Sequence, residues 1–293
     1  MMTTHSQVDV LMVGHFARDR IVVDGQGETV SGGAVYYGSV ALRRLGLRVA
    51  VATRLHPGDA SRLKELESEG VEVFSTAAAE TSGIENIYRS ADMERRVCRP
   101  LGFAGPFRPA DIPDLPAKII AVVPIIAGEV DLSLLRRLAR RAPVALDVQG
   151  FVRVREGDAL VFRPWEEMEE GLAQVTYLKV DRAEAELLTG QTDMVAAARR
   201  LAGYGPREVV VTQSAGVTVY AGGEVARAPF TSRSLAGRTG RGDTCFAAYL
   251  GLRLSAPVAE ATRLAAAVTS LKQERPGPWR GSRAEAERRA REG

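Results

Sequence analysis

The residues with the clearest chemical potential lie late in the chain, where a glycine-rich turn runs into a helix of small and apolar residues. The turn contains Gly237, Gly240 and Gly242, and Asp243 follows directly. Such a turn exposes main-chain N–H groups, which together with the positive end of the helix dipole form a cradle for anions, usually phosphate. At a helix N-terminus Asp243 most often caps the helix, but beside a phosphate its carboxylate accepts the proton of an attacking alcohol. From these residues alone, both roles stay open.

Other phosphate-binding and metal-binding patterns are absent from the sequence. It contains no GxxxxGK[ST], which excludes a P-loop enzyme, and its first predicted strand leads into Gly14-His15-Phe16 rather than GxGxxG. Cys98 and Cys245 form no CxxC pair and the three histidines are scattered, so neither a zinc site nor a disulfide framework is predicted. Phosphate recognition is therefore expected in the late glycine-rich turn.

The composition is that of a folded protein without a strongly charged surface. The 293 residues are 45% hydrophobic and 26% charged, and the formal charge of +3 reflects 39 basic against 36 acidic side chains. We therefore expect no nucleic-acid partner. The N-terminus has no basic region, and residues 10–13 are too short an apolar run for a signal peptide or a membrane span. A cytoplasmic protein without membrane contact is expected.

The elements that must position the turn alternate between short apolar runs and amphipathic stretches, which is typical of a parallel sheet covered by helices on both faces. The fold class is α/β, in a single domain spanning residues 1–293. Predicted strands cover residues 8–13, 48–53, 71–74, 118–123, 144–148, 176–180, 208–212 and 217–220. Predicted helices cover residues 33–45, 59–69, 132–141, 182–188, 194–202, 243–254 and 258–272. Ser282 and Glu285 form a capping box for a last helix rich in Arg and Glu.

Two stretches break this alternation. Residues 20–23, and residues 82–99 around a turn at residues 91–92, are typical of antiparallel ribbons. We predict that about residues 18–30 and 82–100 form a small β lid, which would exclude water from a reaction centre. An ordinary extension of the sheet edge explains the pattern equally well.

Four segments carry a resemblance to one family. Residues 237–243 resemble the second signature of the ribokinase/PfkB carbohydrate kinases, usually written D-T-x-G-A-G-D, and residues 31–34 are similar to its first signature, a Gly-Gly pair that opens a helix. Residues 181–190 resemble the family's N-x-x-E region, and residues 209–212 with Gly216 resemble the strand and turn beside the nucleotide. The segments occur in the family's order. The resemblance implies a ribokinase-like doubly wound, mostly parallel sheet flanked by helices, with a small β lid.

The resemblance implies a kinase that transfers the γ-phosphoryl group of ATP to a hydroxyl of a small sugar, inositol or nucleoside. The implied catalytic residues are Asp243 as base and Gly240, Arg241 and Gly242 as anion-hole amides. Asp19, Gly32, Gly33, Tyr37 and Gln149 are expected at the substrate, and Asp181, Thr212, Gly216 and Ala266 at ATP. Glu184 would act on Mg²⁺ through water, and a monovalent cation is a further cofactor that the resemblance allows.

Several positions depart from the family pattern. Gly237 and Arg238 stand where the second signature has Asp-Thr, and Arg241 replaces its Ala. Tyr37 replaces an Asn that usually bonds sugar hydroxyls. The acceptor therefore stays open. The turn after Thr212 is one residue shorter than usual, with Ser214 at a common Gly position, so the donor stays open too, with ADP or another nucleoside triphosphate as alternatives to ATP.

Two further segments favour one class of acceptor. Residues 13–19 and 145–153 are similar to the inositol kinase branch of the family, and pentose, hexose and nucleoside acceptors stay open as alternatives. A small polyhydroxyl substrate is expected. A homodimer is expected as well, because lid ribbons in this family often pair between subunits. The alternative function is a non-catalytic nucleotide or sugar sensor on the same fold. The retained Asp243 favours the kinase.

Overall fold

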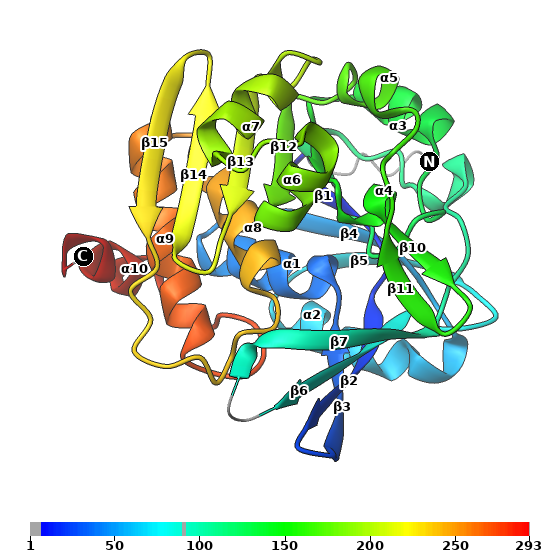
Figure 1. The fold of residues 1–293 in the computed structure, drawn as a ribbon. Helices are drawn as coiled ribbons and strands as arrows, with labels where there is room; N and C mark the ends of the chain where they lie inside the picture. Colours follow the sequence, from blue (N-terminus) through cyan, green and yellow to red (C-terminus); the bar gives the residue numbers. More distant parts are fainter. Residues whose placement is uncertain (1–6, 90–91, 293) are drawn as a thin grey trace.

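The computed structural model describes residues 7–89 and 92–292, and one large sheet lies at its centre (Figure 1). The strands of this sheet are β1 Val8–Val13, β4 Val49–Leu55, β5 Glu72–Ala77, β8 Ala117–Val122, β9 Val144–Asp147, β12 Tyr177–Asp181, β13 Glu208–Thr212, β14 Gly216–Ala221 and β15 Glu224–Pro229. They are ordered β15-β14-β13-β12-β9-β8-β1-β4-β5. The eight predicted strands are all present, with ends shifted by a few residues, and β15 was not predicted. The predicted α/β class, with a mostly parallel sheet, is confirmed.

Burial on both faces explains why the central strands are parallel. Every residue of β1 and of β13 is buried, and both strands are rich in valine. β1 pairs in parallel with β4 and β8, and β12 pairs in parallel with β9 and β13. β13, β14 and β15 pair antiparallel, because the connections between them are too short for a crossover. The carboxyl ends of the parallel strands therefore meet at one edge of the sheet.

Helices cover both faces of the large sheet (Figure 1). On one face lie α1 Ala34–Arg44, α8 Arg241–Arg253 and α9 Val258–Gln273, and on the other α3 Leu132–Ala139, α5 Met168–Leu172, α6 Arg182–Thr189 and α7 Met194–Ala202. The remaining helices are α2 Lys64–Ser68, α4 Gln149–Val152 and α10 Arg283–Glu292, and the Glu285 N–H donates to Ser282 Oγ at 3.2 Å, as the capping box predicts. In the described part of the chain, no helix has the length and apolarity needed to cross a bilayer.

The helix predicted over residues 59–69 is only partly α-helical. A 3₁₀ helix spans Pro57–Leu63, and α2 begins after it. The His56 ring accepts the Gly58 N–H at 3.0 Å and thereby caps the 3₁₀ turn. Apolar spacing could not distinguish the two helix types, because the 3₁₀ turns are short and place Leu63 and Leu66 in the same core.

A second sheet of four strands lies beside the large one in the described residues, in the order β3-β2-β6-β7. Its strands are β2 Ala17–Val23, β3 Gln26–Gly32, β6 Gly83–Arg89 and β7 Asp92–Gly102. Strands thus occupy both stretches predicted to form ribbons, and residue 91 of the predicted turn lies outside the described residues. We call this sheet the lid. Figure 1 shows its β7 strand crossing below the carboxyl ends of the large sheet.

A further ribbon was missed by the sequence analysis. β10 Arg153–Glu156 pairs antiparallel with β11 Ala159–Phe162. Gly157-Asp158 separates an alternating run, Val152-Arg153-Val154-Arg155, from the apolar run Ala159-Leu160-Val161-Phe162, which is a hairpin signal that the sequence does carry. The short length of both strands made the signal easy to overlook. β11 lies against β7 of the lid.

Candidate active site

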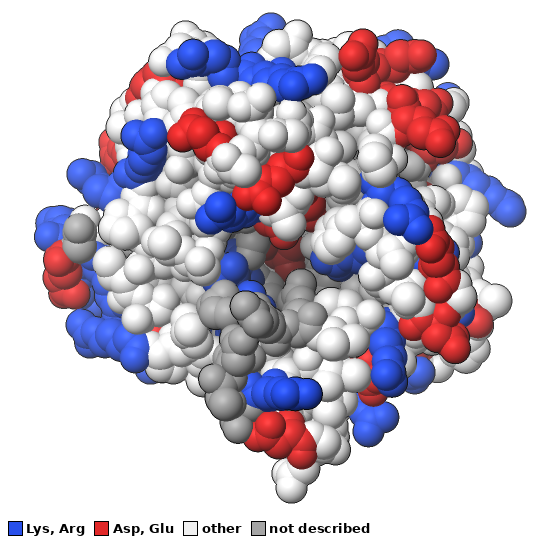
Figure 2. Space-filling view, viewed as in Figure 1, with Lys and Arg blue, Asp and Glu red and all other residues white. Residues whose placement is uncertain are grey.

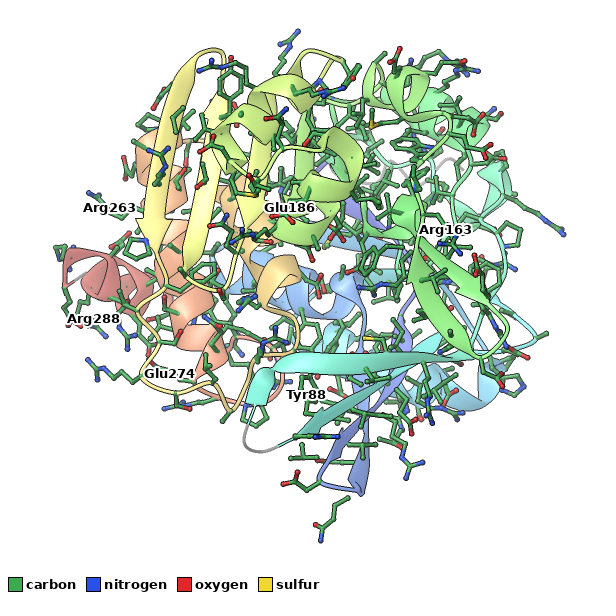
Figure 3. The ribbon with its side chains drawn as sticks, viewed as in Figure 1. Tyr88, Arg163, Glu186, Arg263, Glu274 and Arg288 are labelled. Carbon is green, nitrogen blue, oxygen red and sulfur yellow. The ribbon has the colours of Figure 1, made fainter. Side chains whose placement is uncertain are left out.

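A cavity of about 630 Å³ lies between the carboxyl ends of the parallel strands and the lid. Figure 2 shows a hollow near the centre of this face, with acidic side chains at its floor and Lys and Arg beside it. In Figure 3, Glu186 of α6 lies above this region and Tyr88 of β6 lies below it. The Tyr88 hydroxyl is 3.4 Å from Thr239 Oγ1, so the lid touches the glycine-rich turn.

The glycine-rich turn enters α8 through Gly240, which is the N-cap residue. Its φ of +83° is in the left-handed region, and the ring of Tyr37 fills the space where a Cβ would lie. Asp243 therefore lies within the first helical turn and lines the cavity, while the cap position belongs to another residue. The positive end of the dipole of this helix lies at the same end of the cavity. Among the predicted amides, that of Arg241 donates to the Arg238 carbonyl at 3.2 Å.

We expect Gly240→Ala to damage both folding and phosphate binding. An alanine at this φ loses about 1–2 kcal/mol of stability from backbone strain, and its methyl group collides with the Tyr37 ring. Gly46→Ala is the matched control, because Gly46 has a φ of +92° and open space around it. Denaturant unfolding should show a larger loss for Gly240→Ala, and only this variant should lose turnover. Equal losses of stability and activity in the two variants would contradict the assignment.

A buried ion pair supports the glycine-rich turn from below. Lys179 Nζ lies 3.1 Å from Asp147 Oδ1 and 3.7 Å from Glu184 Oε2, and all three side chains are almost wholly buried. Burial lowers the pKa of Lys179, but the two carboxylates outweigh it and hold the pKa above its ordinary value. A Cβ added at position 242 would be in ordinary van der Waals contact with the Lys179 side chain, so Gly242 packs directly on that lysine. The positive charge of Lys179 therefore lies beneath the anion cradle.

The start of α6 supplies carboxylates that fit Mg²⁺. Asp181 Oδ1 accepts the Glu184 N–H at 2.9 Å, and Glu184 Oε2 accepts the Asp181 N–H at 2.7 Å. Glu184 Oε1 is buried and has no hydrogen-bond partner in the described residues. Those residues contain no group of three or more His, Cys, Asp and Glu side chains that could hold a metal. Asp181 and Glu184 are carboxylates of the kind that, together with several waters, hold Mg²⁺ beside phosphates.

Polar groups from the lid line the opposite end of the cavity. Asp19 Oδ1 accepts the Ile84 N–H at 2.8 Å, and Gly32 makes room for this carboxylate because a Cβ there would collide with it. The Cys98 thiol donates to Asn86 Oδ1 at 3.4 Å, and both side chains face the cavity. A carboxylate and an amide can both bond to hydroxyl groups. This end of the cavity therefore suits a polyhydroxyl acceptor.

The unpredicted β10–β11 ribbon completes the acceptor end. Arg153, Leu160 and Phe162 line the cavity, and Arg153 Nη2 donates to Gln149 Oε1 at 2.9 Å. The Arg153 guanidinium also lies 6.0 Å from the centroid of the Phe162 ring. None of these three residues was predicted at the site, because their ribbon was not predicted.

Most of the predicted site residues come together at this cavity. Its lining includes Asp19, Gly33, Tyr37, Gln149, Asp181, Thr212, Gly240, Arg241, Gly242 and Asp243. Gly32 lies behind Asp19, and Glu184 lies beneath Asp181. Gly216 and Ala266, both expected at ATP, are buried and do not line the cavity. The backbone after β15 covers α9 next to Ala266, where the Thr231 N–H donates to Ser270 Oγ at 2.9 Å.

The chain is similar to known kinases over most of its length. Residues 9–283 match the profile described as pfkB family carbohydrate kinase. The cytidine kinase of Thermococcus kodakarensis is 27% identical over 277 residues, which cover 88% of this chain and 93% of that protein. A solved pyrophosphate-dependent kinase in the ribokinase family, complexed with a pyrophosphate analog and myo-inositol, is 36% identical, with a TM-score of 0.88 over 95% of this chain and 99% of that one. Arabidopsis thaliana ribokinase, complexed with ribose and ATP, shares the fold at 20% identity, with a TM-score of 0.77 over 97% of this chain and 99% of that one.

Proposed function

The chain belongs to the pfkB family of carbohydrate kinases, phosphotransferases that act on hydroxyl groups, and on this premise we propose that its phosphoryl donor is inorganic pyrophosphate. We further propose that the acceptor is a cyclitol of the myo-inositol type and that Asp243 is the general base. The acceptor follows the similarity to the inositol kinase branch at residues 13–19 and 145–153. The donor differs from the ATP that the sequence resemblance implies.

The observation that carries the proposal is the shape and charge of the donor end. Lys179, Arg238 and Arg241 line it together with the N-terminus of α8, which suits a compact and highly charged anion. Gly216 and Ala266, where an adenine would be expected, are covered by protein. Pyrophosphate needs the phosphate cradle but no base pocket. The pyrophosphate-dependent relative, at 36% identity, supports the same donor.

The acceptor end supports a neutral ring with several hydroxyl groups. Asp19, Asn86 and Gln149 supply acceptors and donors around the cavity, while Ile84 and Ile125 give it an apolar wall. A cyclitol carries hydroxyl groups on its rim and C–H groups on its faces, so it can use both kinds of surface. The relative named above was solved with myo-inositol, which supports this acceptor class.

The proposed reaction is an in-line transfer. An acceptor oxygen attacks one phosphorus of pyrophosphate, the bridging P–O bond breaks, orthophosphate leaves, and the hydroxyl proton passes to the Asp243 carboxylate. A carboxylate at a helix N-terminus is a weak base, but the alcohol becomes acidic only as its bond to phosphorus forms. The α8 N-terminus and Lys179 stabilise the charge on the phosphoryl oxygens. Asp181 and Glu184 would hold Mg²⁺ through water, and the bound ion would supply further charge neutralisation.

The test is a matrix of donors and acceptors followed by phosphorus NMR. Purified protein with Mg²⁺ is given pyrophosphate, ATP or ADP, each with myo-inositol, ribose or cytidine. We expect a phosphomonoester and orthophosphate from pyrophosphate and myo-inositol, because this pair fits both ends of the cavity. Turnover with ATP but not with pyrophosphate would disprove the proposed donor. Transfer to cytidine or ribose alone would disprove the acceptor, and ligand binding without any transfer would favour the sensor function.

A further inference from the structure

Behind the phosphate cradle lies a buried lysine that does not line the reaction cavity. Lys272, near the end of α9, is 2% exposed, and its Nζ donates to the main-chain carbonyl of Gly237. The same ammonium lies 5.0 Å from the centroid of the Tyr37 ring. Burying an ammonium is unfavourable unless such partners surround it. Lys272 therefore joins α9 both to the start of the glycine-rich turn and to the aromatic ring that packs on Gly240.

The backbone is closely fitted around this contact. The Gly237 N–H donates to the Gln273 carbonyl at 2.7 Å, and a Cβ at Gly237 would collide with the main chain of Arg275. At the other end of the turn, the Tyr37 ring leaves no room for a side chain at Gly240. Lys272 thus contacts Gly237 at one end of residues 237–240 and, at the other end, the Tyr37 ring that packs on Gly240. These residues lead directly into the anion cradle.

The charged and titratable groups around Lys272 come from several elements. Burial lowers the pKa of Lys272 to about 7, although the nearby Asp243 of α8 partly opposes this shift. Tyr37 of α1 stays neutral, because burial and nearby acidic groups raise its pKa well above the ordinary value. Lys272 also borders a second cavity of about 1020 Å³, whose other charged and titratable lining residues are Asp24, Glu28, Tyr36, Arg62 and Glu65. This cavity gives the buried ammonium a route for exchanging protons with solvent.

We propose that Lys272 is a positioning residue of the phosphate end, which fixes residues 237–240 and takes up a proton when an anion binds in the cradle. The physical reason is that a bound anion adds negative charge beside Asp243 and so favours the charged form of the amine. Protonation in turn strengthens the bond to the Gly237 carbonyl and tightens the cradle, because the coupling is reciprocal. The proposal rests on the proposed function only in placing the donor phosphate against residues 240–242.

The test measures sulfate binding to the whole protein by calorimetry, in buffers of different ionisation enthalpy. Sulfate is a suitable probe because it does not titrate near neutral pH. We expect the wild-type protein to take up as much as about half a proton at pH 7, since an amine with a pKa of about 7 is half protonated there. Sulfate affinity should fall as the pH rises from 6 to 9, because more of the unbound protein then carries a neutral amine.

Lys272→Met removes the charge while keeping the side-chain length, and the exposed Lys64→Met is the matched control. We expect Lys272→Met to bind sulfate at least about tenfold more weakly at pH 6, without proton uptake. Its affinity should no longer change between pH 6 and 9. A residue that served only to support the fold would lower the affinity and leave the pH dependence unchanged. Lys64→Met should match the wild type in all three measurements.

Two results would overturn the proposal. One is sulfate binding by the wild-type protein at pH 7 with no proton uptake, a measurement that does not depend on any variant folding. The other is wild-type affinity and pH dependence in Lys272→Met. Failure of the proposed function would give a result different from either of these two. A protein that takes up the proton with sulfate yet transfers no phosphoryl group from pyrophosphate would keep the role of Lys272 and lose the proposed donor.

Discussion

Asp243→Asn should lower the turnover number by about two to four powers of ten while leaving the fold intact. The asparagine has the same shape but cannot accept the proton of the attacking hydroxyl at neutral pH. Asp243 lines the cavity from the first turn of α8, while Gly240 holds the N-cap position. Donor and acceptor should still bind. Steady-state kinetics with pyrophosphate and myo-inositol, together with thermal unfolding, would measure the two effects.

The matched control for this variant is Asp114→Asn, at an exposed aspartate away from the cavity. It should keep wild-type kinetics and wild-type thermal unfolding. If Asp243→Asn kept the wild-type rate on the true acceptor, Asp243 would not be the base. If it lost the fold as well as the rate, its carboxylate would have a structural role that the geometry of α8 does not indicate.

Lys179→Met should lower the free energy of unfolding by about 3–5 kcal/mol, because it leaves buried carboxylates without their counter-charge. Asp147 and Glu184 both lie within 4.0 Å of the Lys179 ammonium, and neither has access to solvent. The loss should shrink as the pH falls from 8 to 5. Burial raises the pKa of Glu184 to about 7 although Lys179 lowers it, and removing Lys179 raises it further, so the folded variant gains stability as this carboxylate becomes protonated. Urea unfolding at several pH values measures the effect.

Lys118→Met is the control for Lys179→Met, because Lys118 forms an ion pair with Asp9 at 2.8 Å while remaining 47% exposed. Its loss should stay below about 1 kcal/mol. The double variant Lys179→Met/Asp147→Leu should recover part of the lost stability, because it removes one of the uncompensated charges. Equal losses for Lys179→Met and Lys118→Met would show that burial does not govern the strength of this pair.

The features that could be predicted from the sequence were those that depend on residues close together in the chain. The strands were predictable because short valine-rich runs are buried on both faces, as in β1 and β13. The glycine-rich turn and Asp243 at the start of α8 were predictable as one unit because they lie within a few residues of one another. The β10–β11 ribbon carried a local signal too, but its four-residue strands were not distinguished from loop. Because this ribbon was not predicted, Arg153 and Phe162 were absent from the predicted site.

The sequence by itself thus determined the parallel α/β architecture, the glycine-rich turn at the start of α8, and the acidic residue in the first turn of that helix, since each depends on neighbours in the chain. Only the tertiary structure decided which charges surround that helix end. Lys179 meets Asp147 because β12 lies beside β9, and Lys272 meets Gly237 because α9 returns alongside the glycine-rich turn. The tertiary structure also decided that Gly216 and Ala266 are buried beneath other parts of the protein. A buried charge depends on partners that are distant in sequence, so no local pattern could reveal it.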